Sequence, residues 1–212
     1  MLGDLSKKFE SNGNPGAISN GWGDAGGKSY GMYQLASNTG SVHNYLGWAK
    51  QKGYWFANDL LTYDVGSVGF DNLWYWLGKS ANREDFIKSQ HDYIMEKYYV
   101  PAVEALKEAG YDVEGKLSVT MADVVWSRAV QYGPYQIVEM FTIACQSLGY
   151  PNLSYVNDKY FDEEMIKAIY LDVCSTDDWT NGSPSLRDGL FSRFKWECAM
   201  ALDQLKKESA DV

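Results

Sequence analysis

Two carboxylates near the N-terminus, Glu10 and Asp24, are the residues with the clearest chemical potential. They flank residues 11–28, a stretch with six glycines, which indicates a loop or hairpin. Cleavage of a glycosidic bond needs an acid that protonates the leaving oxygen and a second group that activates water or stabilises the oxocarbenium-like state. Glu10 is the candidate acid and Asp24 the candidate base, and an inverting reaction would separate their carboxyls by roughly 6.5–9.5 Å.

The element expected to position Glu10 is a short helix over residues 2–10, in which apolar residues recur at helical spacing. Glu10 would lie at its C-terminal end, where the helix dipole disfavours a negative charge. That position favours a protonated carboxyl near neutral pH, as a general acid requires. Asp24 has an alternative interpretation, because aspartate beside glycine is a common turn residue.

Three short motifs occur in the order found in a known family. Residues 10–19 (ESNGNPGAIS), 31–35 (GMYQL) and 129–134 (AVQYGP) resemble motifs of the lytic transglycosylases of the goose-lysozyme type. The segment around Asp24 and Ser29 instead resembles the hairpin of phage-type lysozymes and chitosanases. The resemblance implies a mainly helical, lysozyme-like α+β fold with a small β-hairpin near the N-terminus, in a single catalytic domain over residues 1–212.

The same resemblance implies roles for individual residues. Glu10 and Asp24 would be catalytic, and the hydroxyl of Ser29 would hold the attacking water. The implied substrate-binding residues are Tyr30, Tyr33, Gln34, Gln131 and Tyr132. No cofactor and no metal are expected, because the two histidines and three cysteines are isolated and widely spaced.

Composition excludes several classes of partner. The net charge of −9 and the lack of a basic stretch argue against nucleic acid and anionic membranes. The chain has no run of eighteen apolar residues and no signal peptide. We expect a monomer made in the cytoplasm, with free thiols, that reaches its substrate after lysis or by dedicated export.

The remaining elements follow from periodicity and capping residues. Helices are expected over residues 41–52 (capped by Ser41), 66–78, 83–110 (capped by Asn82 and broken or kinked at Pro101), 118–132 (capped by Ser118), 134–148, 162–175 and 183–207, with one hairpin over 22–35. Arg193 and Glu197 have i,i+4 spacing on the last helix, which predicts a structural ion pair.

The leading functional hypothesis is a peptidoglycan hydrolase, a lysozyme or muramidase that cleaves the β-1,4 bond between N-acetylmuramic acid and N-acetylglucosamine. Its setting would be a phage endolysin, a tail-associated lysin or an exported effector, and its partners the glycan strands of peptidoglycan. A lytic transglycosylase acting on the same bond is the first alternative. A chitosanase and a non-catalytic glycan-binding or virion structural module are further alternatives.

Overall fold

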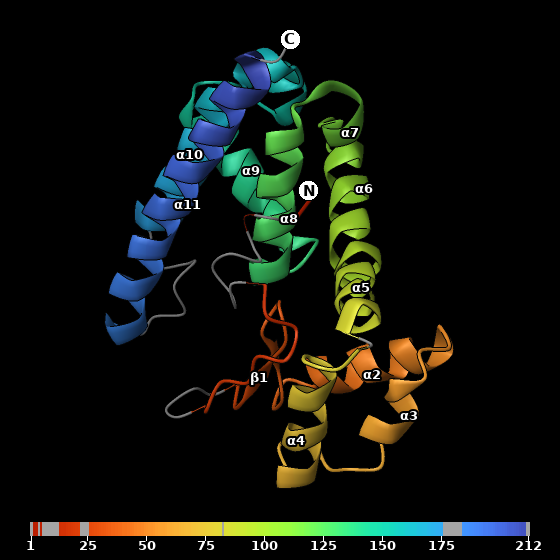
Figure 1. Cartoon of the computed structure of the whole chain (residues 1–212). Helices are drawn as coiled ribbons and strands as arrows, with labels where there is room; N and C mark the ends of the chain where they lie inside the picture. The colour runs from red at the N-terminus through yellow and green to blue at the C-terminus, as the bar shows by residue number, and fades with distance from the viewer. Residues whose placement is uncertain are drawn as a thin grey trace. The chain divides into compact units, whose positions relative to one another are not determined.

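The computed structural model describes residues 2–3, 5, 13–21, 26–81, 83–175 and 184–210 (Figure 1). The chain divides into two compact units. One is formed by Ser6–Glu96, and we call it the inserted unit. The other combines Met1–Leu5 with Lys97–Val212, and we call it the split unit. The expectation of a single domain over residues 1–212 remains a prediction.

The described part of the inserted unit begins with an antiparallel hairpin that pairs Ser29 with Ala36 and Tyr30 with Leu35. Ile18 forms an isolated bridge to Tyr30, so the preceding loop continues the small sheet by one residue. Four helices follow. The elements are β1 (Ser29–Tyr30), β2 (Leu35–Ala36), α2 (Ser41–Gln51), α3 (Phe56–Leu60), α4 (Val68–Leu77) and α5 (Arg83–Ile94).

Aromatic rings build the core of the inserted unit. Trp74 of α4 is fully buried and lies against four other rings. The centroid separations are 5.3 Å to Tyr30, 5.8 Å to Tyr45, 5.8 Å to Phe70 and 4.9 Å to Phe86. Three of these pairs are edge-to-face, the arrangement that the ring quadrupole favours.

The described residues of the split unit form helices joined by turns and loops, with no strand, and α8 is its most buried helix. Nine residues of α8 are buried. It packs against α6, α7, α9, α10 and α11, and α10 also packs against α9 and α11. The elements that follow α5 are η1 (a π-helix, Met95–Tyr99), α6 (Val100–Glu108), α7 (Val113–Lys116), α8 (Val119–Tyr132), α9 (Gln136–Ser147), η2 (Leu153–Val156), η3 (Lys159–Phe161), α10 (Asp162–Ser175) and α11 (Pro184–Ala210).

The mainly helical class with one small hairpin is confirmed by the described residues. Ser118 caps α8 as predicted, because its hydroxyl accepts from the Met121 N–H. Ser41 does not cap α2, which is preceded instead by Gly40 in the left-handed conformation. The helix expected over residues 83–110 is interrupted close to Pro101, as predicted: α5 ends at Ile94, the next five residues adopt the wider π-helical turn, and Pro101 lies in the first turn of α6.

No helix in the described ranges has both the length and the apolar character needed to cross a membrane.

Candidate functional site

The two predicted catalytic carboxylates, Glu10 and Asp24, lie outside the described residues. The described residues that follow Glu10 (13–21) and those on both sides of Asp24 (13–21 and from 26 onward) belong to the inserted unit. The described part of the candidate site therefore consists of residues 13–21 and 26–36 and of the helices that contact them.

The loop that follows Glu10 is anchored at Pro15. Its carbonyl oxygen accepts two hydrogen bonds, from the indole Nε1 of Trp74 at 3.0 Å and from Nε2 of Gln90 at 3.0 Å. The same Gln90 side chain accepts from the backbone N–H of Met32 at 2.8 Å through Oε1. One buried amide thus joins the loop to the hairpin turn. Because all three contacts are buried, breaking any of them would leave an unpaired polar group in the core.

Three glycines allow this close packing. Gly31 has φ +77°, and a side chain there would collide with the Gln90 amide. Gly16 and Gly78 bring the loop backbone directly onto the backbone at the end of α4, so that a methyl group at Gly78 would overlap Gly16. Space therefore requires glycine at position 78, and at position 31 the positive φ requires it as well as the space.

The two flanks of the Asp24 segment lie beside one another. A methyl group at Gly21 would come within 2.5 Å of the Gly27 carbonyl carbon. The backbone N–H of Asn38 donates to the Gly26 carbonyl oxygen at 2.9 Å, which fixes the returning strand. Residues 22–25 therefore join two parts of the backbone, at Gly21 and Gly26–Gly27, that lie in contact with each other.

Tyr30, a predicted substrate-binding residue, is fully buried. Its hydroxyl donates to Oδ1 of Asp71 at 2.6 Å, and Lys28 pairs with the other oxygen of that carboxylate at 2.5 Å. Burial and the neighbouring Asp71 carboxylate raise the pKa of the Tyr30 phenol well above its usual value. The phenol is a neutral donor in the core, with no ring face open to a ligand in this conformation.

The other predicted residues of the hairpin are also engaged. Ser29 is buried in β1, and its backbone N–H donates to the Ser19 hydroxyl at 2.8 Å. Tyr33 is buried, with its hydroxyl 3.2 Å from Nδ1 of His91. Gln34 has φ +50°, and its side-chain amide donates to the Gly31 carbonyl at 3.0 Å. The side chains of Tyr33 and Gln34 and the backbone of Ser29 support the turn, and the roles of all three residues toward a substrate remain predictions.

Gln131 and Tyr132 belong to the split unit, at the C-terminal end of α8. Within the described ranges, Oε1 of Gln131 is enclosed without a hydrogen-bond partner. The ring of Tyr132 lies 5.8 Å from the Arg128 guanidinium and 6.4 Å from the ring of Phe194. Their predicted contact with substrate remains untested.

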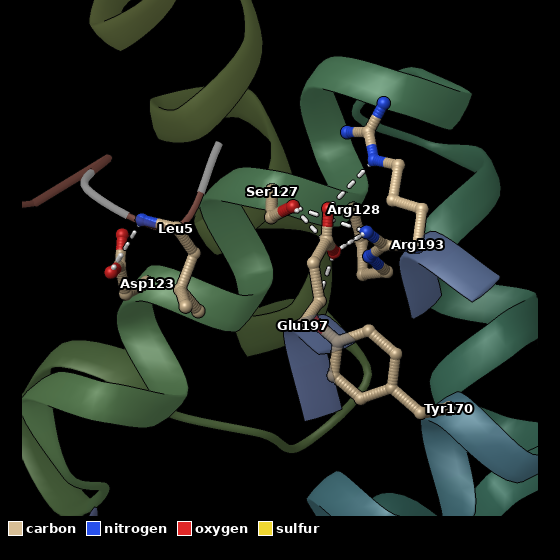
Figure 2. Close-up of polar contacts among 7 residues, drawn as sticks. All are labelled: Leu5, Asp123, Ser127, Arg128, Tyr170, Arg193 and Glu197. Atoms are coloured by element: carbon tan, nitrogen blue, oxygen red, sulfur yellow. Dashed lines mark hydrogen bonds and ion pairs between the residues drawn. The ribbon is translucent and has the colours of Figure 1, made fainter. Parts of the chain in front are cut away.

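A buried ion network on α8 and α11 was only partly foreseen (Figure 2). Arg128 and Glu197 are both fully buried and form an ion pair. Arg193 donates to the same carboxylate at 2.9 Å, which confirms the predicted i,i+4 pair. The hydroxyls of Ser127 and Tyr170 also donate to it, each at 3.2 Å. Burial, followed by the adjacent carboxylate, raises the pKa of Tyr170.

The contacts by which Gln90 and Asp71 hold the loop and the hairpin in place were not predicted. The sequence around Gln90 nevertheless indicates a buried role for that residue. Gln90 stands beside Ser89 on the buried face of α5, among Phe86, Tyr93 and Ile94. A polar pair at core positions of an amphipathic helix indicates buried hydrogen bonds. In the part of the chain that the structure describes, no group of three or more histidine, cysteine or carboxylate side chains could hold a metal ion.

The model of the family described as "Type VI secretion system spike protein VgrG3-like, C-terminal" matches residues 2–198. The chain is also 35% identical, over 133 residues, to the type VI secretion system spike protein VgrG3 of Vibrio cholerae serotype O1 (strain ATCC 39315 / El Tor Inaba N16961). That alignment covers 62% of this chain and 12% of the relative, so the chain spans a small part of the relative's length.

These findings correct the family and the function predicted from the short motifs. The assignment to the lysozyme-like superfamily was wrong, because the match over residues 2–198 is to a spike-protein family. The hypothesis of a muramidase, with its transglycosylase, chitosanase and virion-module alternatives, is replaced for the same reason. A phage endolysin is likewise the wrong setting, since both matches name a secretion system.

Proposed function

The chain belongs to the VgrG3-like C-terminal family of type VI secretion system spike proteins, and from this premise we propose that it is a catalytic domain exported with the spike. We propose a glycoside hydrolase that uses Glu10 as general acid and Asp24 as the residue that activates water. We propose that the domain is exported by a dedicated system and acts on a glycan polymer.

One observation carries the catalytic part of the proposal: the acid-bearing segment lies at the start of the family match and is followed by a tightly anchored loop. Pro15, five residues after Glu10, is fixed by two buried side chains. A catalytic acid needs a fixed position relative to the leaving oxygen. The double anchor provides such a fixed point close in sequence to Glu10.

The hairpin supports the role proposed for Asp24. Asp24 belongs to residues 22–25, which are bounded by Gly21 and Gly26. The backbones at Gly21 and Gly27 are in close contact with each other. Because only four residues join these two fixed points, the length of the chain limits how far the Asp24 carboxylate can lie from them. Ser29 lies on the strand that follows these four residues, and we propose that it assists in orienting water after a local rearrangement, because its side chain is buried in the present conformation.

The test compares the wild type with Glu10→Gln on three insoluble β-1,4-linked polymers: one of glucose, one of a 2-amino sugar and one of a 2-acetamido sugar. We expect new reducing ends from at least one polymer with the wild type, and a loss of about 10²–10⁴-fold in rate with Glu10→Gln. Glu84→Gln is the matched control, since Glu84 is an exposed glutamate of the same unit, and it should retain the wild-type rate.

Export is tested separately. The full-length spike that bears this domain should appear in the medium of cells with an active secretion system, and not when the system is disabled. Release of reducing ends at equal rates by the wild type and Glu10→Gln would refute the catalytic proposal. Equal release of the protein with and without the system would refute the export proposal.

A further inference from the structure

The inserted unit has a hollow on its surface that the proposed active site does not use. Its volume is about 360 Å³. The hollow is formed by α2, the loop after it, α5 and the start of η1, and its lining residues are Trp48, Lys52, Tyr54, Asp92, Met95 and Glu96.

Trp48 provides an unused hydrogen-bond donor at this hollow. The side chain is 6% exposed, and within the described ranges its indole Nε1 is enclosed without an acceptor. A buried donor without a partner is costly to a folded protein and therefore calls for an explanation. In this conformation the Nε1 atom is not reached from the surface, so an oxygen atom of a bound molecule would satisfy it after a shift of the Trp48 side chain.

The remaining wall combines aromatic and charged groups. The Tyr54 ring lies 5.8 Å from the Trp48 ring, and its hydroxyl donates to Asp92 at 3.1 Å. Lys52 pairs with Glu96 at 2.7 Å, and Lys88 pairs with Asp92. The two carboxylates are thus balanced by two ammonium groups, which favours a neutral polar ligand over an ion.

The backbone is also unusual at this place. Met95 and Glu96 open the π-helix η1, whose wider turn interrupts the run of α5 into α6. π-helical turns cost stability and are frequent at functional sites. Here the wider turn begins with the two residues that line the hollow.

We propose that this hollow binds one hexopyranose unit of a glycan. A sugar ring offers an apolar face of C–H groups to the aromatic wall, hydroxyl donors to Asp92 and Glu96, and oxygen acceptors to Lys52 and the Trp48 indole. The volume suits one ring better than a longer ligand. The choice of a sugar rests on the proposed function, since a domain that cleaves a glycan benefits from a second binding site for the same polymer.

The experiment uses the ¹⁵N-labelled full chain with Glu10→Gln, so that bound sugars are not cleaved. The probes are β-1,4-linked trisaccharides of glucose, glucosamine and N-acetylglucosamine. The indole N–H signal of Trp48, identified by its loss in Trp48→Phe, should shift saturably with at least one of them. Asp92→Asn and Glu96→Gln should each weaken that binding about 10-fold. Trp76→Phe, at an exposed tryptophan of α4, should leave it unchanged.

The outcomes separate this inference from the proposed function. If no trisaccharide moves the Trp48 signal, or if the signals of Trp48 and Trp76 move together without saturation, the sugar site is refuted even when Glu10→Gln abolishes cleavage. If Trp48 responds saturably and the wild type cleaves no polymer, the sugar site stands and the proposed hydrolase falls. The Glu96→Gln variant keeps the test interpretable, because that side chain is 40% exposed and its loss leaves the core intact.

Discussion

Replacing Glu197 by leucine should remove the shared acceptor of the buried network. The carboxylate accepts from Arg128, from Arg193 at 2.9 Å, and from Ser127 and Tyr170 at 3.2 Å each. Arg128 stays charged, because a guanidinium does not lose its proton in proteins. Removing one partner of a buried ion pair costs about 3–5 kcal/mol. In a protein of roughly 200 residues this lowers Tm by about 6–20 °C.

Differential scanning calorimetry on the full chain would measure the change. Glu163→Leu is the control, because Glu163 forms an exposed i,i+4 pair on α10, and it should cost less than about 1 kcal/mol. The double variant Arg128→Met with Glu197→Leu should recover most of the stability, since no fully buried charge is left and the partly exposed Arg193 can reach solvent. A single variant as stable as the control, or a double variant that loses the sum of both changes, would refute this reasoning.

Two further predictions concern backbone packing and pH. Gly78→Ala should destabilise the inserted unit by about 1–3 kcal/mol, because the new methyl group meets the Gly16 backbone, and urea unfolding followed by aromatic fluorescence would detect the change. Burial raises the pKa of the Asp162 carboxyl. Just above the ordinary pKa of about 4, the folded protein therefore retains a proton that the unfolded chain has lost. The unfolding free energy should fall as pH rises from about 4 through the raised pKa. Asp162→Asn keeps an acceptor for the Ser118 N–H and should abolish that slope in unfolding titrations; an unchanged slope would show that another group is responsible.

Most helices were predictable, because their signals are local. Ser118 marks the start of α8 and Gly78 follows the last residue of α4, and both are read from a few neighbouring residues. The π-helix at Met95–Tyr99 was not predictable, because its sequence has the same apolar spacing as an ordinary helix. The Arg128–Glu197 pair was missed because the partners are 69 residues apart, and periodicity says nothing about which distant polar residues meet.

The family was predicted less well than the fold. Short motifs with glycine and a carboxylate describe a local turn, and unrelated families need similar turns, so the motifs suggested the wrong family. Tyr30 was expected to face a substrate, yet its hydroxyl is the buried partner of Asp71. An aromatic residue in a two-residue strand can point to either side, and only the contacts with Phe70 and Trp74 decide which.

The split unit joins the two ends of the sequence. The Asp123 carboxylate on α8 accepts hydrogen bonds from the backbone N–H groups of Gly3 at 2.6 Å and of Leu5 at 3.2 Å; Figure 2 shows the contact with Leu5. The Glu208 carboxylate on α11 accepts from the backbone N–H groups of Val119 and Thr120 at the start of α8. During synthesis, the inserted unit can complete its contacts while the ribosome is still making α8. The split unit must wait for α11 and must keep residues 2–5 available until then. Its folding should be the slower of the two, since closing such long loops has a high entropic cost.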